Sequence, residues 1–201
     1  MTNQSSMHAY TEWAKSRLDE MDAAVSSMEA GIKDLRSQAR ANAESALADM
    51  KVRRDEFSKE MDELRETGES AWADINVQMQ ANWNAFEAAA KSYLNAATEM
   101  AEQNRAAFRA RAEAQMKAWQ NTVEKLQSAA TEFTGERRAD VETAAERLRK
   151  EAESARGRLE SLSQAGTESW SAMMKALSDS RQAFEKANKA AFESFTRATK
   201  K

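Results

Sequence analysis

The chain has 201 residues with no proline, no cysteine and one histidine, and its net charge at pH 7 is −3. Alanine, glutamate, lysine, arginine and methionine are frequent, and these residues favour helices, whereas proline would break them. The lack of cysteine excludes disulfide frameworks and thiolate chemistry. Charges of both signs are interleaved, whereas nucleic-acid binding needs clustered basic residues. We therefore expect an all-α protein that binds no nucleic acid.

The first part of the chain shows the pattern of a long amphipathic helix. Apolar residues recur at alternating spacings of three and four, which is the seam of a coiled coil. These residues are Leu18, Met21, Val25, Met28, Ile32 and Leu35. The pattern predicts a helix over about residues 7–66, which ends at Thr67-Gly68-Glu69 because glycine readily adopts the left-handed conformation that terminates helices.

The same three-residue sequence returns as Thr134-Gly135-Glu136. The two sequences divide the chain into three predicted helices, over about 7–66, 69–133 and 136–199, each about 90 Å long at 1.5 Å per residue. We expect long antiparallel amphipathic helices that form an elongated three-helix coiled-coil bundle. On this interpretation residues 1–201 are a single elongated helical domain.

An internal repeat supports a second interpretation. The segment 68–94 returns as 166–192, with a glycine and a tryptophan in the same places. The offset of 98 residues is a whole number of heptads, so heptad patterns alone produce part of the match. Either the chain forms two tandem helical hairpins with turns at Gly68 and Gly166, or Gly166 is a kink in the third helix. We favour three helices, because an isolated glycine in a helix costs only about 1 kcal/mol.

The residues that catalysis needs are scarce. The single histidine, His8, has no second histidine with which to share a metal, and zinc and di-iron sites lack their usual ligands. Catalysis by a serine, histidine and aspartate would depend on His8, and no glycine-rich phosphate loop follows a strand. We expect no catalytic, cofactor-binding or metal-binding residues, and we predict that the protein is not an enzyme.

Aromatic residues are the candidates for binding. The segment from residue 167 onwards carries more basic than acidic side chains and an apolar stripe, which is typical of a helix that lies on an apolar or anionic surface. The competing interpretation is that these aromatic side chains pack in a core between helices. The candidate surface-binding residues are Trp83, Trp170, Phe184, Phe192 and Phe195.

Two short motifs resemble those of phasins, the bacterial proteins that coat polyester storage granules. The motifs are Asn84-Ala85-Phe86-Glu87 and Gln182-Ala183-Phe184-Glu185-Lys186-Ala187, set in alanine-rich segments without proline or cysteine. The resemblance implies a helical, self-associating protein without cofactors that coats hydrophobic inclusions.

We therefore expect a non-enzymatic protein that coats a granule or an anionic lipid surface and forms homo-oligomers. The alternative is a self-associating coiled-coil scaffold, or an adaptor that binds other helical proteins. The first residues lack the apolar core of a secretory signal, and no segment is apolar enough to cross a bilayer. We expect a cytoplasmic location, peripheral on inclusions or on a membrane surface.

Overall fold

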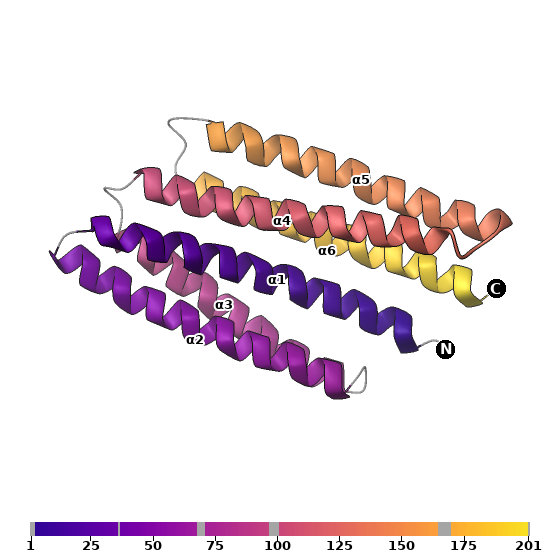
Figure 1. The fold of residues 1–201 in the computed structure, drawn as a ribbon, viewed down its shortest axis with the longest axis horizontal. Helices are drawn as coiled ribbons and strands as arrows, with labels where there is room; N and C mark the ends of the chain where they lie inside the picture. Colours follow the sequence, from indigo (N-terminus) through magenta and orange to yellow (C-terminus); the bar gives the residue numbers. More distant parts are fainter. Residues whose placement is uncertain (1–2, 36, 68–70, 97–100, 165–169, 201) are drawn as a thin grey trace. The chain divides into compact units, whose positions relative to one another are not determined.

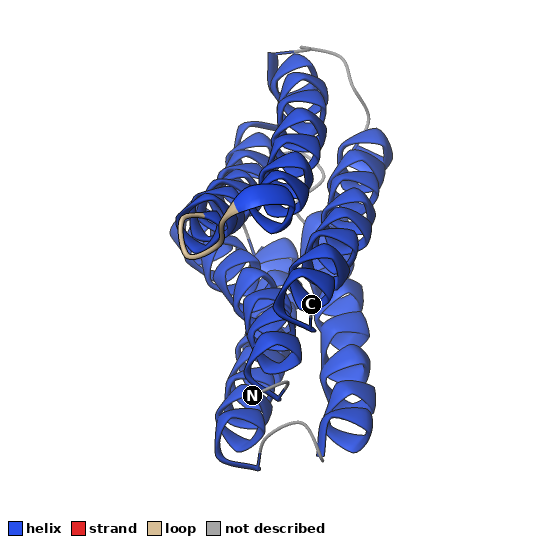
Figure 2. Ribbon diagram, turned by 90° about the vertical axis from the view of Figure 1, so that its right-hand side faces the viewer, coloured by secondary structure: helices blue, strands red, loops and turns tan. Residues whose placement is uncertain are grey.

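The computed structural model describes residues 3–35, 37–67, 71–96, 101–164 and 170–200, and within these ranges the regular structure is helical and no strand is present (Figures 1 and 2). The prediction of an all-α protein is confirmed. The elements are α1 (Asn3–Gly31), the short 3-10 helix η1 (Ile32–Asp34), α2 (Ser37–Thr67), α3 (Trp72–Ala96), α4 (Ala101–Ala130), α5 (Gly135–Gln164) and α6 (Trp170–Lys200).

Each of the three long helices predicted from the sequence is divided into two. The first is interrupted by η1, after which Leu35 has an extended backbone with φ −78° and ψ 147°. A 3-10 turn preserves the spacing of three residues, so the apolar pattern continues through the break and does not reveal it. The second predicted helix is divided between Ala96 and Ala101, and the third between Gln164 and Trp170.

The predicted turn at Thr134-Gly135-Glu136 is confirmed. Helix α4 ends at Ala130, and its last turn tightens through backbone hydrogen bonds, including the one that Phe133 N donates to Ala130 O. Gly135 then begins α5 with a φ of +62°, which glycine adopts without steric penalty. At the first predicted turn, α2 ends at Thr67 as expected, and Gly68 and Glu69 lie outside the described residues.

The contacts within the chain divide it into two compact units. Unit A comprises residues 14–114, and unit B comprises residues 1–13 together with residues 115–201. The boundaries between the units fall inside α1 and α4. The sequence predicted a single domain over 1–201, and these two units are described separately below.

In unit A, α2 and α3 form an antiparallel hairpin joined by polar contacts. Asn82 donates from Nδ2 to Glu60 Oε1 at 2.7 Å and accepts at Oδ1 from Arg53 Nη1 at 3.3 Å. Helix α1 runs parallel to α3. The Tyr93 hydroxyl donates to the carbonyl oxygen of Met28 at 2.6 Å. Earlier in both helices, the guanidinium of Arg17 lies over the ring of Trp83, so the contacts follow the same order along the two helices.

In unit B, α5 and α6 pack against each other in opposite directions. Ala144 and Leu148 of α5 share one core with Phe184 and Ala191 of α6. The chain therefore reverses between Gln164 and Trp170, and the interpretation of a single third helix with a kink is wrong. Gly166 itself lies outside the described residues. The second interpretation, two tandem hairpins, contained a reversal here, but we did not favour it because the apolar pattern resumes in the same heptad phase on both sides.

The helices form two equivalent sets of three. Helices α4, α5 and α6 begin at Ala101, Gly135 and Trp170, each 98 residues after the start of α1, α2 and α3, respectively. Buried residues match at the same offset, for example Val25 with Val123 and Phe86 with Phe184. Matching helix starts do not follow from heptad periodicity, so the chain contains two repeats. The first repeat comprises α1 to α3, and the second repeat comprises α4 to α6.

Candidate functional site

The candidate surface-binding residue Trp83 lies in the core of unit A. Its side chain is 3% exposed and stacks on Phe86, with 5.9 Å between the ring centroids. The guanidinium carbon of Arg17 lies 4.5 Å from the centroid of the Trp83 ring, which is the geometry of a cation–π contact. In this conformation Trp83 is covered by its own unit.

The other candidates lie on α6. Phe184 is 4% exposed and meets Trp119 edge to face, with 5.0 Å between the ring centroids. Trp170, Phe192 and Phe195 belong to the helical backbone of α6, and their side chains lie outside the described residues. The structure therefore places Trp83 in unit A and the other four candidates on one helix of unit B.

Helix α6 separates apolar from basic side chains. One face is buried and contains apolar residues with two polar ones between them: Met173, Leu177, Ser180, Phe184, Asn188 and Ala191. The exposed side chains include four cations: Lys175, Lys186, Lys189 and Arg197. Helix α6 is thus amphipathic with a basic outer face, as the sequence indicated.

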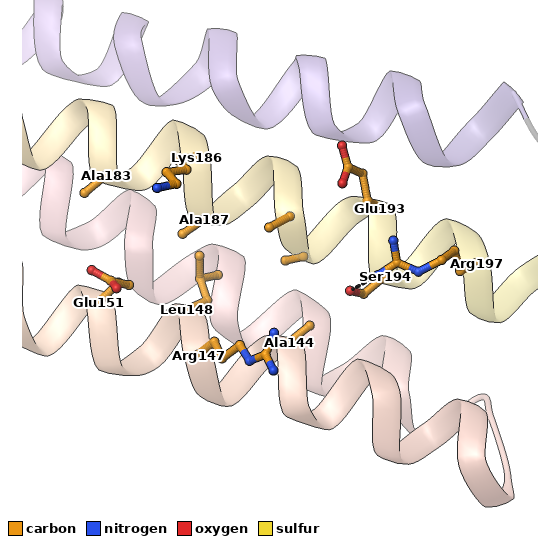
Figure 3. Close-up of a pocket in the computed structure, with 12 residues that line it drawn as sticks. Ala144, Arg147, Leu148, Glu151, Ala183, Lys186, Ala187, Glu193, Ser194 and Arg197 are labelled. Carbon is orange, nitrogen blue, oxygen red and sulfur yellow. Dashed lines mark hydrogen bonds between the residues drawn. The ribbon is translucent and has the colours of Figure 1, made fainter.

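The packing of α6 against α5 leaves a groove beside the buried face. A groove of about 420 Å³ lies between α5 and α6 (Figure 3), and alanines line much of it. They are Ala144, Ala183, Ala187, Ala190 and Ala191. In the first repeat, Tyr93 stands at the position of Ala191, and its aromatic side chain is buried. The smaller side chain of Ala191 fills less of the space between the two helices in the second repeat.

A second groove of about 330 Å³ lies between α4 and α5, also within unit B. Its apolar lining consists of Met116, Trp119, Val123 and Ala152. The nitrogen Nε1 of Trp119 is buried and has no hydrogen-bond partner among the described residues, and the same holds for Ser180 Oγ and Asn188 Oδ1. Each buried polar atom without a partner costs about 1–3 kcal/mol, so the core of unit B is less stable than its buried area suggests.

The structure also shows a buried charged cluster that the sequence analysis missed. Arg111 is fully buried in unit A, where Nε and Nη2 donate to Oε1 of Glu20 at 2.8 and 2.7 Å, and Nη2 also donates to Glu87. Burial lowers the pKa of the guanidinium, but Glu87 and Glu20 raise it by more, so the pKa of Arg111 lies above its ordinary value. The sequence spacing of Arg111 could have indicated its burial, because Phe108, Arg111 and Gln115 continue the alternating spacing of three and four residues that marks the buried face.

A smaller ion pair lies in unit B. Lys125 of α4 donates from Nζ to Glu12 of α1, whose side chain is mostly buried. Among the described residues, no group of three histidine, cysteine, aspartate or glutamate side chains is arranged to hold a metal ion. Within the same residues, no helix combines the length and apolar character needed to cross a membrane.

Comparison with known proteins does not place the chain in a family: no protein-family model matches it, and neither a curated protein nor a solved structure matches it significantly.

Proposed function

We propose that this protein is a non-enzymatic amphipathic coat that adsorbs reversibly on a hydrophobic surface, such as a polyester granule or an anionic lipid surface. The observation that supports the proposal best is the amphipathic packing of α6, which buries an apolar stripe in the core of unit B beside an alanine-lined groove. Its exposed face carries four cations and two acids, Asp179 and Glu193. The resemblance of its motifs to those of phasins points to the same role.

The packing in unit B favours the release of α6 from α5 and its binding to an external apolar surface. Burial of a large apolar side chain stabilises by about 1.5–3 kcal/mol, and an alanine methyl group contributes much less. The alanines of α5 that α6 covers therefore lose little free energy of burial when α6 separates from α5. Phe184 and Leu177 would regain their burial on an external apolar surface, and the unpaired polar atoms of Ser180 and Asn188 would be free to meet water.

The cations of α6 add a second attraction. Lys186, Lys189 and Arg197 are exposed on the helix whose other face is apolar. Such a helix lies in the plane of a lipid or granule surface with its apolar face inward, and anionic groups attract its outer side chains. Because this attraction acts through water, it weakens as the ionic strength rises.

The test is to lock α6 onto α5. Ala144→Cys and Ala191→Cys introduce two thiols from facing helices that line the same groove, and the chain has no other cysteine. After oxidation, the disulfide is verified by mass, and the protein is sedimented with anionic liposomes and with polyester particles. We expect the oxidised protein to stay in the supernatant and the reduced protein to sediment with the particles.

The single variant Ala144→Cys is the control, since it cannot form the intramolecular bond and should adsorb in both redox states. Equal adsorption of the oxidised and reduced double variant would contradict a role for the opening of α6. Failure of the unmodified protein to adsorb on either surface would contradict the proposed function as a whole.

A self-associating scaffold is the second candidate, and the groove between α4 and α5 favours it. Its apolar lining is flanked by Glu124, Arg149 and Arg156, so a helix with a small apolar face and complementary charges would fit along it. In a scaffold the mass measured by sedimentation equilibrium rises with concentration, and Ala152→Glu in the groove should abolish the rise. A protein that remains monomeric up to high concentration would rule out this candidate.

A further inference from the structure

The two units are each built from both repeats. Unit A contains α2, α3 and most of α1, and it is completed by residues 101–114 from the second repeat. Unit B contains α5, α6 and the rest of α4, and it is completed by residues 1–13 from the first repeat. Each repeat thus receives the beginning of the other repeat's first helix. Because the two beginnings are equivalent in position, either could in principle complete either unit.

The side chains distinguish between these two arrangements. Trp13 of the first repeat stands at the position that Arg111 occupies in the second. If a second copy of the first repeat completed unit A, Trp13 would take the place of Arg111 beside Glu20 and Glu87. Glu20 is 1% exposed, and a buried carboxylate that loses the cation to which it is hydrogen-bonded is strongly destabilised.

The reciprocal combination loses its ion pairs as well. Ala110 stands at the position of Glu12, and Ala118 stands at the position of Glu20. If another copy of the second repeat completed unit B, Lys125 would meet Ala110 where it now meets Glu12. Arg111 would be buried beside Ala118, which stands in the place of Glu20, and it would therefore lose that carboxylate as a partner.

We infer that the two repeats of this chain recognise each other as unlike partners, and that the contact of Arg111 with Glu20 and Glu87 excludes pairing between two like repeats. The pair of Lys125 and Glu12 acts in the same direction in unit B. A polar side chain in a helix seam selects its partner in this way, because the wrong partner leaves it buried and unpaired. The partner of the first repeat is therefore a second repeat, from the same chain or from a second copy.

The experiment uses the full chain, cut after it has folded. A protease site is inserted after Ala96, the last residue of α3, and the folded protein is cleaved and mixed with an equal amount of the same protein labelled with nitrogen-15. Native mass spectrometry then shows which fragments pair. We expect every complex to contain one first and one second repeat. Like pairs in the statistical ratio would overturn the inference.

Two variants of the cleaved protein separate selectivity from stability. Arg111→Leu leaves two carboxylates without their cation and should weaken the association of the fragments by on the order of 100-fold or more. The triple variant Glu20→Leu, Glu87→Gln and Arg111→Leu removes the whole buried cluster. Removal of a complete buried ion cluster is often neutral or stabilising, so these fragments should remain paired, but like pairs should now appear.

The matched control is Arg138→Leu, which removes an exposed arginine of α5 that pairs within its own helix with Glu142. It should change neither the association nor the choice of partner. Unchanged association in Arg111→Leu would overturn the inference. A triple variant that still forms unlike pairs alone would also overturn it, because the selectivity would then lie in other residues.

Discussion

Arg111 Nη2 lies 2.7 Å from Glu20 Oε1, with both side chains buried and a separation of 91 positions in the chain. Removal of one member of such a cluster costs about 3–5 kcal/mol, because the remaining charge stays buried. We expect Arg111→Leu to lower the free energy of unfolding of the intact chain by about this amount in urea titrations followed by circular dichroism. Arg138→Leu on the exposed face of α5 should change it little, and equal effects of the two variants would contradict the expectation.

The buried carboxyl group of Glu60 should make the free energy of unfolding depend on pH. Burial raises its pKa, the hydrogen bond from Asn82 opposes this, and Glu56 and Glu63 raise it further. The folded state therefore binds a proton at Glu60 more readily than the unfolded chain, so stability from this residue is lost above the folded pKa and recovered as pH falls. We expect Glu60→Gln to be more stable than the parent at pH 7, with the difference vanishing below the ordinary value of 4.5.

Exposed Glu66 supplies the control for this experiment. Glu66→Gln removes the same charge from α2 without a buried carboxyl, so its effect on stability should be small and nearly independent of pH. Thermal or urea unfolding between pH 4 and 8 measures both variants. If Glu60→Gln were less stable than the parent at pH 7, the hydrogen bonds of the carboxylate would outweigh its burial.

The equivalent phenylalanines of the two repeats should differ in their contribution. Phe86→Ala and Phe184→Ala both remove a buried ring, and such changes cost about 3–5 kcal/mol, with less cost where the surroundings can collapse. Phe86 is fully buried against Trp83, whereas Phe184 packs in a core that is rich in alanine. We expect the smaller loss for Phe184→Ala in chemical denaturation, and the reverse order would contradict this account of unit B.

Gly135 and Gly157 should respond to alanine with opposite signs. A side chain added at Gly157 in α5 meets no atom within 4 Å, so Gly157→Ala should stabilise the protein by up to about 1 kcal/mol through helix propensity. Gly135 also has open space around it, but its φ of +62° disfavours any side chain. Gly135→Ala should therefore destabilise, and melting temperatures of the two variants on either side of the parent value would confirm the difference.

The helical class and the buried positions could be read from the sequence because both depend on local rules. Helix propensity and apolar spacing located Val25, Met28, Phe86 and Leu126 on buried faces, and Gly135 in a turn. The break at 32–35 was not predicted, and the reversal between α5 and α6 was predicted only in the interpretation that we did not favour, because apolar spacing of three and four continues across each of them. Spacing records which face is buried but not the direction of the next helix.

The buried charges were missed for a related reason. Arg111 continues the apolar alternation and Glu20 lies beside it, next to Met21, yet each is charged, and a charged residue in a helix is usually exposed. Only the tertiary structure shows that they compensate each other. The aromatic candidates on α6 are a different case: their amphipathic pattern is present as predicted, and the pattern alone does not distinguish a core from a surface.

The division of α1 between the two units has a consequence for synthesis on the ribosome. A chain emerges from its N-terminus at about 5–20 residues per second, and domains tend to fold as they emerge. Every residue of unit A has been made once Ala114 has been added, so unit A can fold while the rest is still being translated. Unit B needs residues 1–13 and the segment after 115. We therefore expect residues 1–13 to reach their final place after residues 14–114 have folded, because Glu12 can pair with Lys125 only once Lys125 has been made.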